Sequence, residues 1–382
     1  MVTTTDMDGV LTRAVAAGEV PGVVALAADD RGVRYQAAFG RRRLGQDAAM
    51  TLGTIFGMAS MTKPLVAVAA LQLVEQGRLA LDEPAGERLP ELAAVQVLDG
   101  FDDAGAPRLR SPRRAVTLRH LLTHTAGFAY EFLNADVHRL QQQMGAAFSS
   151  QDAPMVFDPG GRWEYGKSIG WVGRLVEHVS GRSLEDHLRE RILGPLGMAD
   201  TSYVVGPDRR ARLASLHQRL PDGSLRAADT PVPAPRASYS GTGLYATGPD
   251  YVRFLRMLLG GGQLDGVRLL HSETVAAMAR NQIGALTVRP LRSLMPDATH
   301  DVEFFPGMVT QWGFGGLINT ERAPTGRSAG SWAWAGVNNT YFWIDPPRRL
   351  AGVLLTQVRP FGDPAVLDLF GRFEHAVYAS SG

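Results

Sequence analysis

Two residues in the first quarter of the chain, Ser60 and Lys63, have the types and the spacing of a nucleophile and its base. The apolar run 66–74 predicts a buried helix that begins close to Ser60, and residues three apart on a helix share one face. Pro64 suits the first turn, because the N–H group that proline lacks has no partner there. A hydroxyl and an amine are therefore expected to meet at the amino end of a helix, where nucleophilic catalysis is feasible.

The lysine content of the chain strengthens this interpretation. Among the 39 lysine and arginine residues, lysine occupies only positions 63 and 167. Arginine stays protonated, whereas a desolvated lysine can lose its proton and serve as a base. Chance can also leave two lysines. The spacing from Ser60 favours a chemical reason for Lys63, and both explanations stay open for Lys167.

The composition is that of an ordinary globular chain, with 382 residues, 45% of them hydrophobic, and a net charge of +1. Such a charge gives no reason to expect nucleic acid or an anionic membrane as a partner. The chain has no cysteine, which excludes disulfides, thiolate metal sites and a cysteine nucleophile. No segment approaches the ~20 apolar residues of a membrane span, and the first residues do not resemble a signal peptide. We therefore expect a cytoplasmic protein.

Strand-like segments lie at both ends of the chain and helix-like segments lie between them. The expected strands are 22–28, 33–38, 315–320, 326–332, 339–344 and 350–357, and the expected helices are 7–17, 117–125, 169–179, 183–192, 249–259, 272–280 and 364–378. Thr117 and Ser272 are predicted helix N-caps, and 91–114, 141–154 and 211–238 show no regular pattern.

This order predicts an α+β fold in which a largely antiparallel sheet is built from both termini and flanked by helices. The sheet domain is expected to comprise 1–80 and 205–382. A mostly helical region, 81–204, is expected to be inserted between them, with the active site between the two domains.

Two further stretches are candidates for the same site. Tyr165 is followed two positions later by Lys167, and a phenol can move a proton if nearby cations lower its pKa. Lys63 and Lys167 are candidates for those cations, although a packed aromatic is an equally good explanation on spacing alone. In 331–337, small residues interrupt a strand-like run and allow a substrate to approach the backbone; by itself this stretch predicts an edge strand.

In this order the three elements resemble the serine β-lactamase and penicillin-binding-protein superfamily, and most closely the class C-like esterases known as family VIII carboxylesterases. The likeness covers nearly the whole chain. Other matching stretches are 121–127, 157–160, 195–198, 240–244 and 340–346. The resemblance implies a β-lactamase/transpeptidase-like fold with no cofactor or metal. It also implies that Ser60 is the acylated nucleophile, that Lys63 and Tyr165 are the general-base pair, and that the N–H groups of Ser60 and Val337 form the oxyanion hole.

The chain departs from that family's pattern at two places. Trp334, Ala335 and Gly336 stand where β-lactamases carry Lys-Thr-Gly, so the cation that holds a β-lactam or peptide carboxylate is missing, which favours neutral esters. Lys167 stands where class C enzymes place asparagine. Our hypothesis is that Lys167 holds Tyr165 toward its phenolate form, the alternative being a substrate-facing or surface amine. Trp334, Gly336 and Lys167 are the expected substrate contacts.

Three other patterns are rejected on their context. Residues 161–168 match a phosphate loop, but no apolar strand precedes them and bulky side chains fill the loop. Residues 166–170 match the nucleophile elbow Gly-x-Ser-x-Gly, but no buried strand of a parallel sheet precedes them, so Ser168 is only the second candidate nucleophile, behind Ser60. His120 and His124 have a zinc-like spacing without an evident third ligand, so packing and capping are the expected roles.

The sequence therefore predicts a serine carboxylesterase that hydrolyses small neutral carboxylic esters through an acyl-enzyme on Ser60. Three alternatives stay open. They are a β-lactamase- or D-Ala-peptidase-like hydrolase, an acyltransferase with the same machinery, and a non-catalytic binding protein on this scaffold. The expected partner is a small-molecule ester, with no nucleic acid and no membrane, and the sequence does not indicate an oligomeric state.

Overall fold

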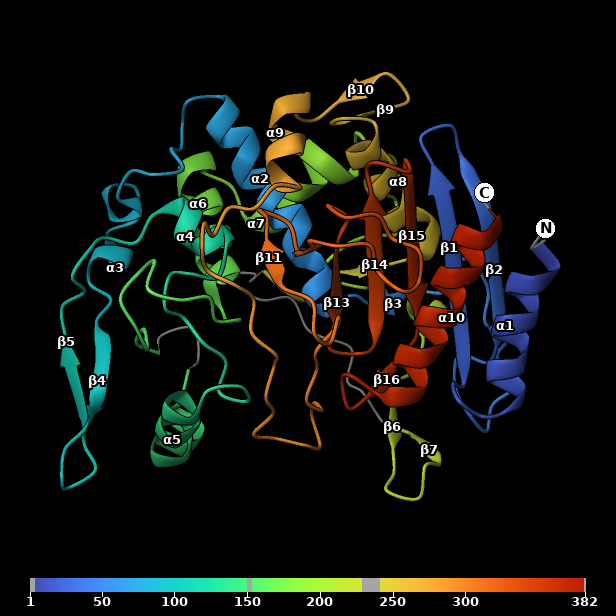
Figure 1. The fold of residues 1–382 in the computed structure, drawn as a ribbon, viewed down its shortest axis with the longest axis horizontal. Helices are drawn as coiled ribbons and strands as arrows, with labels where there is room; N and C mark the ends of the chain where they lie inside the picture. The colour runs from blue at the N-terminus through green and yellow to red at the C-terminus, as the bar shows by residue number, and fades with distance from the viewer. Residues whose placement is uncertain (1–3, 150–152, 229–240, 381–382) are drawn as a thin grey trace.

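A seven-stranded antiparallel sheet forms one half of the molecule in the computed structural model, which describes residues 4–149, 153–228 and 241–380 (Figure 1). The strand order β11-β12-β13-β14-β15-β1-β2 places the N-terminal hairpin beside the C-terminal strands, as predicted. The strands are β11 (Thr310–Trp312), β12 (Leu317–Asn319), β13 (Trp332–Gly336), β14 (Thr340–Asp345), β15 (Leu350–Leu355), β1 (Gly22–Asp29) and β2 (Val33–Gly40).

Helices cover both faces of this sheet, which explains why β14 and β15 are buried along their whole lengths. Neighbouring residues of a strand point to opposite faces. The ring of Phe342 lies 5.7 Å from that of Tyr251 in α8 (Gly248–Leu259). The next residue, Trp343, instead packs 5.7 Å from Phe370 in α10 (Pro364–Ser380), which contacts α1 (Thr4–Ala16).

Two expectations about the sheet are wrong. The predicted strand 326–332 is a series of turns, because Gly326 and Gly330 adopt φ of 114° and 83° and β13 begins only at Trp332. The stretch 331–337 is not an edge strand either. Its strand β13 pairs with β12 on one side and β14 on the other.

The other half of the molecule is mostly helical and is centred on α2 (Lys63–Glu75), whose residues 63–73 are all buried. It packs against α6 (Ser168–Ser180) and α7 (Leu184–Leu188). The remaining helices are α3 (Pro90–Ala93), α4 (Leu118–Leu122), α5 (Ala135–Met144) and α9 (Ser272–Met278). The residues of α2 belong to the predicted sheet domain, 1–80 with 205–382, but the helix packs on α6 and α7 of the predicted helical region, 81–204. The division into these two domains therefore stays a prediction.

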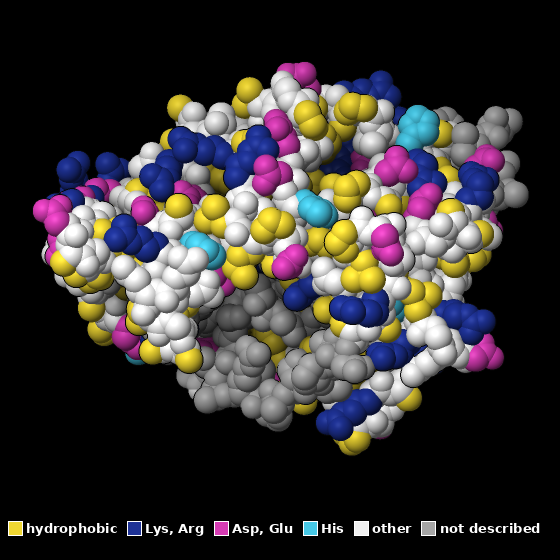
Figure 2. Space-filling model, turned by 90° about the horizontal axis from the view of Figure 1, so that it is seen from below, with side chains coloured by type: hydrophobic (Ala, Val, Ile, Leu, Met, Phe, Trp, Pro, Cys, Tyr) yellow, Lys and Arg dark blue, Asp and Glu magenta, His cyan; other side chains and the backbone are white. Residues whose placement is uncertain are grey.

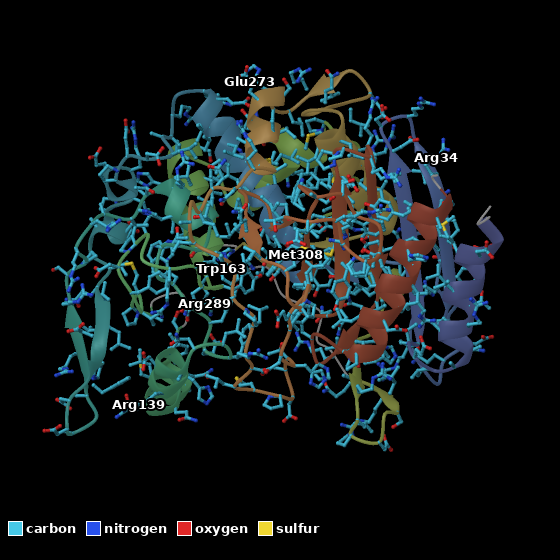
Figure 3. The ribbon with its side chains drawn as sticks, viewed as in Figure 1. Arg34, Arg139, Trp163, Glu273, Arg289 and Met308 are labelled. Atoms are coloured by element: carbon cyan, nitrogen blue, oxygen red, sulfur yellow. The ribbon has the colours of Figure 1, made fainter. Side chains whose placement is uncertain are left out.

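Short elements appear where the sequence shows no pattern. The stretch 91–114 contains the hairpin β4 (Val97–Phe101) and β5 (Pro107–Arg110), and α5 covers part of 141–154. The guanidinium of Arg139 in α5 lies 3.9 Å from the centre of the Phe101 ring and so joins these two elements (Figure 3). The other strands are β3 (Phe56–Gly57), β6 (His217–Arg219), β7 (Leu225–Ala227), β8 (Tyr245–Ala246), β9 (Gln263–Leu264), β10 (Val267–Arg268) and β16 (Val358–Arg359). Of the predicted irregular segments, 150–152 and 229–238 lie outside the described residues, as does Ser240 of the matching stretch 240–244.

One of the two predicted caps is correct. The Thr117 side chain accepts a hydrogen bond from the N–H of His120, and the His120 ring accepts one from the N–H of Thr117. Ser272 is the first residue of α9 rather than its cap, a position that His271 takes without a side-chain hydrogen bond.

Charges of both signs are interspersed with hydrophobic side chains on the face seen in Figure 2. Within the described part of the chain, no helix has the length and hydropathy that crossing a membrane requires.

Candidate active site

Ser60 lies in the 3₁₀ turn η1 (Ala59–Thr62), one turn before α2, and not in the α-helix itself as the sequence predicts. Ala59 before it has φ 47°, a region that residues other than glycine seldom adopt. This sharp turn exposes Ser60 to a cavity of about 350 Å³ whose walls also include Tyr165, Trp334 and Val337. Such unfavourable backbone persists only where the surrounding structure holds it in place.

Gly336 in β13 holds that turn in place. A Cβ atom there would lie 2.4 Å from the carbonyl oxygen of Met58 and 2.4 Å from Oγ1 of Thr340. The missing side chain therefore lets β13 approach the backbone just before the nucleophile. Gly336 is not among the residues that line the cavity, although Ala335 and Val337 on either side of it are, so its contact with substrate stays a prediction.

We expect Gly336→Ala to weaken both activity and folding. Inserting a methyl group into this packed contact should cost about 1–3 kcal/mol of unfolding free energy and displace Ser60 from its partners. Thermal unfolding and kcat/KM for a simple aryl ester measure the two effects. Gly32→Ala is the matched control, because a Cβ atom at Gly32 meets nothing within 4 Å. If Gly336→Ala behaves like the control, the proposed packing role is wrong.

Lys63 is the base that the sequence predicts beside Ser60. Its Nζ lies 2.8 Å from Ser60 Oγ and 3.2 Å from the hydroxyl oxygen of Tyr130. No carboxylate of the described residues forms an ion pair with it, and burial together with the charge of Lys167 lowers its pKa to about 7. A large fraction of this amine is therefore neutral near pH 7 and able to accept the Ser60 proton.

Tyr165 completes the predicted trio, although its electrostatics differ from the prediction. Its side chain is hydrogen-bonded to Ser60, and its oxygen accepts a hydrogen bond of 2.9 Å from the Trp334 indole. Burial raises the pKa of Tyr165 well above its ordinary value, and those two hydrogen bonds only partly oppose the rise. The expected phenolate is therefore wrong, because Tyr165 remains a protonated phenol at neutral pH.

Lys167 acts on Lys63 instead of Tyr165. Its Nζ lies 3.7 Å from a carboxylate oxygen of Glu131 and 5.5 Å from the centre of the Tyr130 ring, and it does not line the cavity. Its positive charge disfavours a second one nearby, so it helps to keep the pKa of Lys63 low. The pair is half-buried, with side chains 18% and 19% exposed, and Lys167 does not line the cavity, so neither alternative drawn from the sequence, a substrate-facing or a surface amine, fits this position well.

We expect Lys167→Met to shift the pH dependence of catalysis to higher pH. Neutral Lys63 is the active form, so activity rises as pH increases through its pKa of about 7. Without the Lys167 charge, and with Glu131 left unpaired, that pKa should rise by on the order of half to one unit. The measurement is kcat/KM against pH. Lys167→Arg keeps the cation and should follow the wild-type profile; a Lys167→Met profile that is unshifted, or shifted to lower pH, would contradict this role.

Tyr130 is a site residue that the sequence interpretation misses. It lies in the segment between α4 and α5, its hydroxyl contacts Lys63, and its ring stacks on Phe132 at 4.8 Å. Burial raises its pKa well above the ordinary value, so it too stays protonated. No motif or spacing marks it. Only its nearness to Gly127, the end of a matching stretch, gives a weak signal.

His124 and Trp163 support Tyr165 from behind. The rings of His124 and Tyr165 lie 4.7 Å apart, and Nδ1 of His124 accepts a hydrogen bond of 3.4 Å from the N–H of Gly166. Trp163 stacks on Tyr165 at 6.4 Å near the middle of the molecule (Figure 3). Burial and the charge of Lys63 lower the pKa of His124, which keeps its ring neutral.

The remaining candidates are not brought together as a site. Ser168 is fully buried at the start of α6, outside the cavity, which removes it as a nucleophile. His120 caps α4, His124 packs on aromatic rings, and no cluster of three potential metal ligands occurs among the described residues. Ser60 and Val337 both line the cavity, and the oxyanion hole formed by their N–H groups stays a prediction.

The sequence and the fold of this chain were compared with those of known proteins. The beta-lactamase family matches residues 7–376. Monacolin J acid methylbutanoyltransferase from Aspergillus terreus is 34% identical over 98% of this chain and 95% of its own, and lovastatin esterase from Penicillium rubens is 33% identical over 97% and 98%. Unliganded simvastatin synthase (LovD) from Aspergillus terreus superposes with a TM-score of 0.84 at 34% identity, covering 99% of this chain and 98% of that one. The chain therefore belongs to the beta-lactamase family and is an enzyme of its serine-hydrolase type.

Proposed function

We propose that this enzyme takes an acyl group from a carboxylic ester onto Ser60 and passes it to water or to a hydroxyl-bearing acceptor. One observation carries the proposal. The Nζ of Lys63, with a pKa of about 7, lies 2.8 Å from Ser60 Oγ at the wall of a cavity. A nucleophile in contact with an amine that is neutral in a large fraction of molecules is the arrangement that acyl transfer requires.

In the first step, Ser60 Oγ forms a bond to the ester carbonyl carbon while its proton moves to Nζ of Lys63. The carbonyl oxygen becomes an oxyanion, for which the N–H groups of Ser60 and Val337 are the proposed donors. The resulting ammonium of Lys63 donates to the hydroxyl oxygen of Tyr130 at 3.2 Å, which helps to hold it in place.

In the second step, the bond between the carbonyl carbon and the alcohol oxygen breaks, and Tyr165 donates its proton to the leaving oxygen. Its raised pKa suits an acid that must hold its proton until a strongly basic alkoxide develops. The proton carried by Lys63, whose Nζ lies 5.0 Å from the centre of the Tyr165 ring, then restores the phenol. Water or an alcohol enters by the reverse of these steps and releases the acyl group.

The relatives support both fates of the acyl group, since two of them are named as a methylbutanoyltransferase and an esterase. A β-lactam or D-Ala peptide is a weaker candidate substrate. In the β-lactamases that the sequence resembles, a lysine binds the carboxylate of the substrate. Trp334 stands at that position in this chain, and its indole N–H donates a hydrogen bond to the Tyr165 hydroxyl. Our proposal is therefore an esterase that also transfers acyl groups to alcohols.

Labelling and product analysis test the proposal. A fluorophosphonate should label the wild-type protein at Ser60, as read by peptide mass spectrometry, and should not label Ser60→Ala. With 4-nitrophenyl butyrate, added alcohols should yield butyrate esters at the expense of butyric acid, while nitrophenol release needs no acceptor. Labelling at another serine, or ester turnover by Ser60→Ala at the native rate, would overturn the acyl-enzyme. Turnover of nitrocefin in preference to every ester would favour the β-lactamase alternative.

A further inference from the structure

Arg359 brings a guanidinium to the wall of the active-site cavity. It lies in β16, its side chain is half-buried, and it lines the same cavity as Ser60. Its Nε donates a hydrogen bond of 3.1 Å to Oδ1 of Asn338, the residue after Val337. Asn338 in turn donates to the carbonyl oxygen of Gly57 at 3.2 Å. Arg359 is thus tied to the backbone on both sides of the proposed oxyanion hole.

The charge of Arg359 has no counterpart among the described residues. No carboxylate of the described residues forms an ion pair with it, whereas the buried Arg327 pairs with Glu374 and the half-buried Arg219 pairs with Asp363. Burial lowers its pKa, and no acidic group counteracts that effect. A guanidinium carries five N–H donors, and the hydrogen bond to Asn338 uses only Nε. A partly desolvated cation without an anionic partner is unfavourable unless a ligand supplies the negative charge.

We propose that Arg359 binds a carboxylate of the substrate, and that the enzyme prefers esters carrying one. This inference rests on the acyl-transfer function proposed above and names its substrate class. The two terminal nitrogens of a guanidinium match the two oxygens of a carboxylate, and such charge-assisted pairs are stronger than neutral hydrogen bonds. Because Ser60 and Arg359 line one cavity, a single small molecule can present its ester to one and its carboxylate to the other.

Arg359 also bears on the preference for neutral esters that the absence of the Lys-Thr-Gly lysine predicts. The resemblance favours neutral esters, because Trp334 stands where β-lactamases carry the lysine of Lys-Thr-Gly. The cavity nevertheless contains a cation, which β16 supplies from a position more than twenty residues further along the chain. The anion site has therefore changed its place in the sequence, and with it the position of the carboxylate relative to Ser60.

Matched ester pairs test this assignment. The probes are 3-acetoxybenzoate against 3-acetoxybenzamide, and the 4-nitrophenyl monoester of adipic acid against its terminal amide, so that the carboxylate is on the alcohol part in one pair and on the acyl part in the other. For at least one pair, wild-type kcat/KM should favour the carboxylate by about tenfold or more, an amount typical of one charge-assisted pair. Arg359→Gln should bring that ratio close to one, and Arg359→Lys should retain part of it.

Several outcomes would overturn the assignment. One is a wild-type ratio near one for both pairs. Another is an Arg359→Gln variant in which both members of a pair slow equally, which would indicate a structural role through Asn338. If Arg359→Gln fails to fold, the wild-type ratio and its decrease with added salt decide the question, since pairing with an exposed substrate charge weakens as salt rises. Failure of the proposed function is distinguishable, because it would abolish fluorophosphonate labelling and amide-ester turnover as well.

Discussion

Replacing Lys63 by arginine is expected to lower kcat/KM for ester turnover by about 10²- to 10⁴-fold, the range that a general base contributes. Arginine retains the positive charge and much of the length of lysine but does not lose its proton at ordinary pH. Burial and Lys167 lower the pKa of Lys63 to about 7, so the wild-type residue is neutral in a large fraction of molecules. The substitution therefore removes the base and keeps a cation beside Ser60. Initial rates with an aryl acetate measure the loss.

Controls separate the loss of the base from a loss of structure. Lys167→Arg makes the same chemical change at the only other lysine and should stay within a few-fold of wild type, since Lys167 acts through its charge. Thermal unfolding of both variants shows whether the buried position at Lys63 tolerates the larger group. A folded Lys63→Arg protein that retains activity within tenfold would mean that Lys63 acts as an electrostatic partner and that another group accepts the Ser60 proton.

The nucleophile and its base could be predicted from sequence because their relation is local. Ser60 and Lys63 are three residues apart beside a long apolar run, so helical geometry alone brings them together. Their partners are different. The hydroxyl of Tyr130 reaches Lys63 from 67 residues away, and Trp334 reaches Tyr165 from 169 residues away. No spacing rule connects such pairs, and resemblance supplied only Tyr165 and Val337.

Roles were harder to predict than positions. The small residues of 331–337 predict room for a substrate, but they do not reveal that the absent Cβ of Gly336 admits the backbone of Met58, a contact that depends on how β13 meets η1. The cations near Tyr165 were expected to lower its pKa, yet burial dominates and raises it. Burial acts on an amine in the opposite direction and lowers the pKa of Lys63. One buried site therefore produces a neutral base and a protonated acid, a division of roles that composition and spacing do not reveal.

That division leads to an expected result for Tyr165→Phe. If Tyr165 protonates the leaving alcohol, its loss should lower kcat/KM for an alkyl ester by about 10²- to 10⁴-fold. A 4-nitrophenyl ester of the same acid should lose much less, because nitrophenol departs as a stable anion and needs no proton. The measurement is the ratio of the two losses for one acyl group, with acid release followed for the alkyl ester. The wild-type and variant proteins should unfold at similar temperatures for the comparison to hold.

Tyr130→Phe is the matched control, since it removes a hydroxyl that contacts Lys63. Any loss it causes should be the same for both leaving groups, because Lys63 acts on Ser60 before the alcohol departs. Equal losses for the two esters in Tyr165→Phe would instead place Tyr165 in the attack step, beside Lys63 as a second base. A low pKa would then have to arise on substrate binding, since burial in the free enzyme raises it.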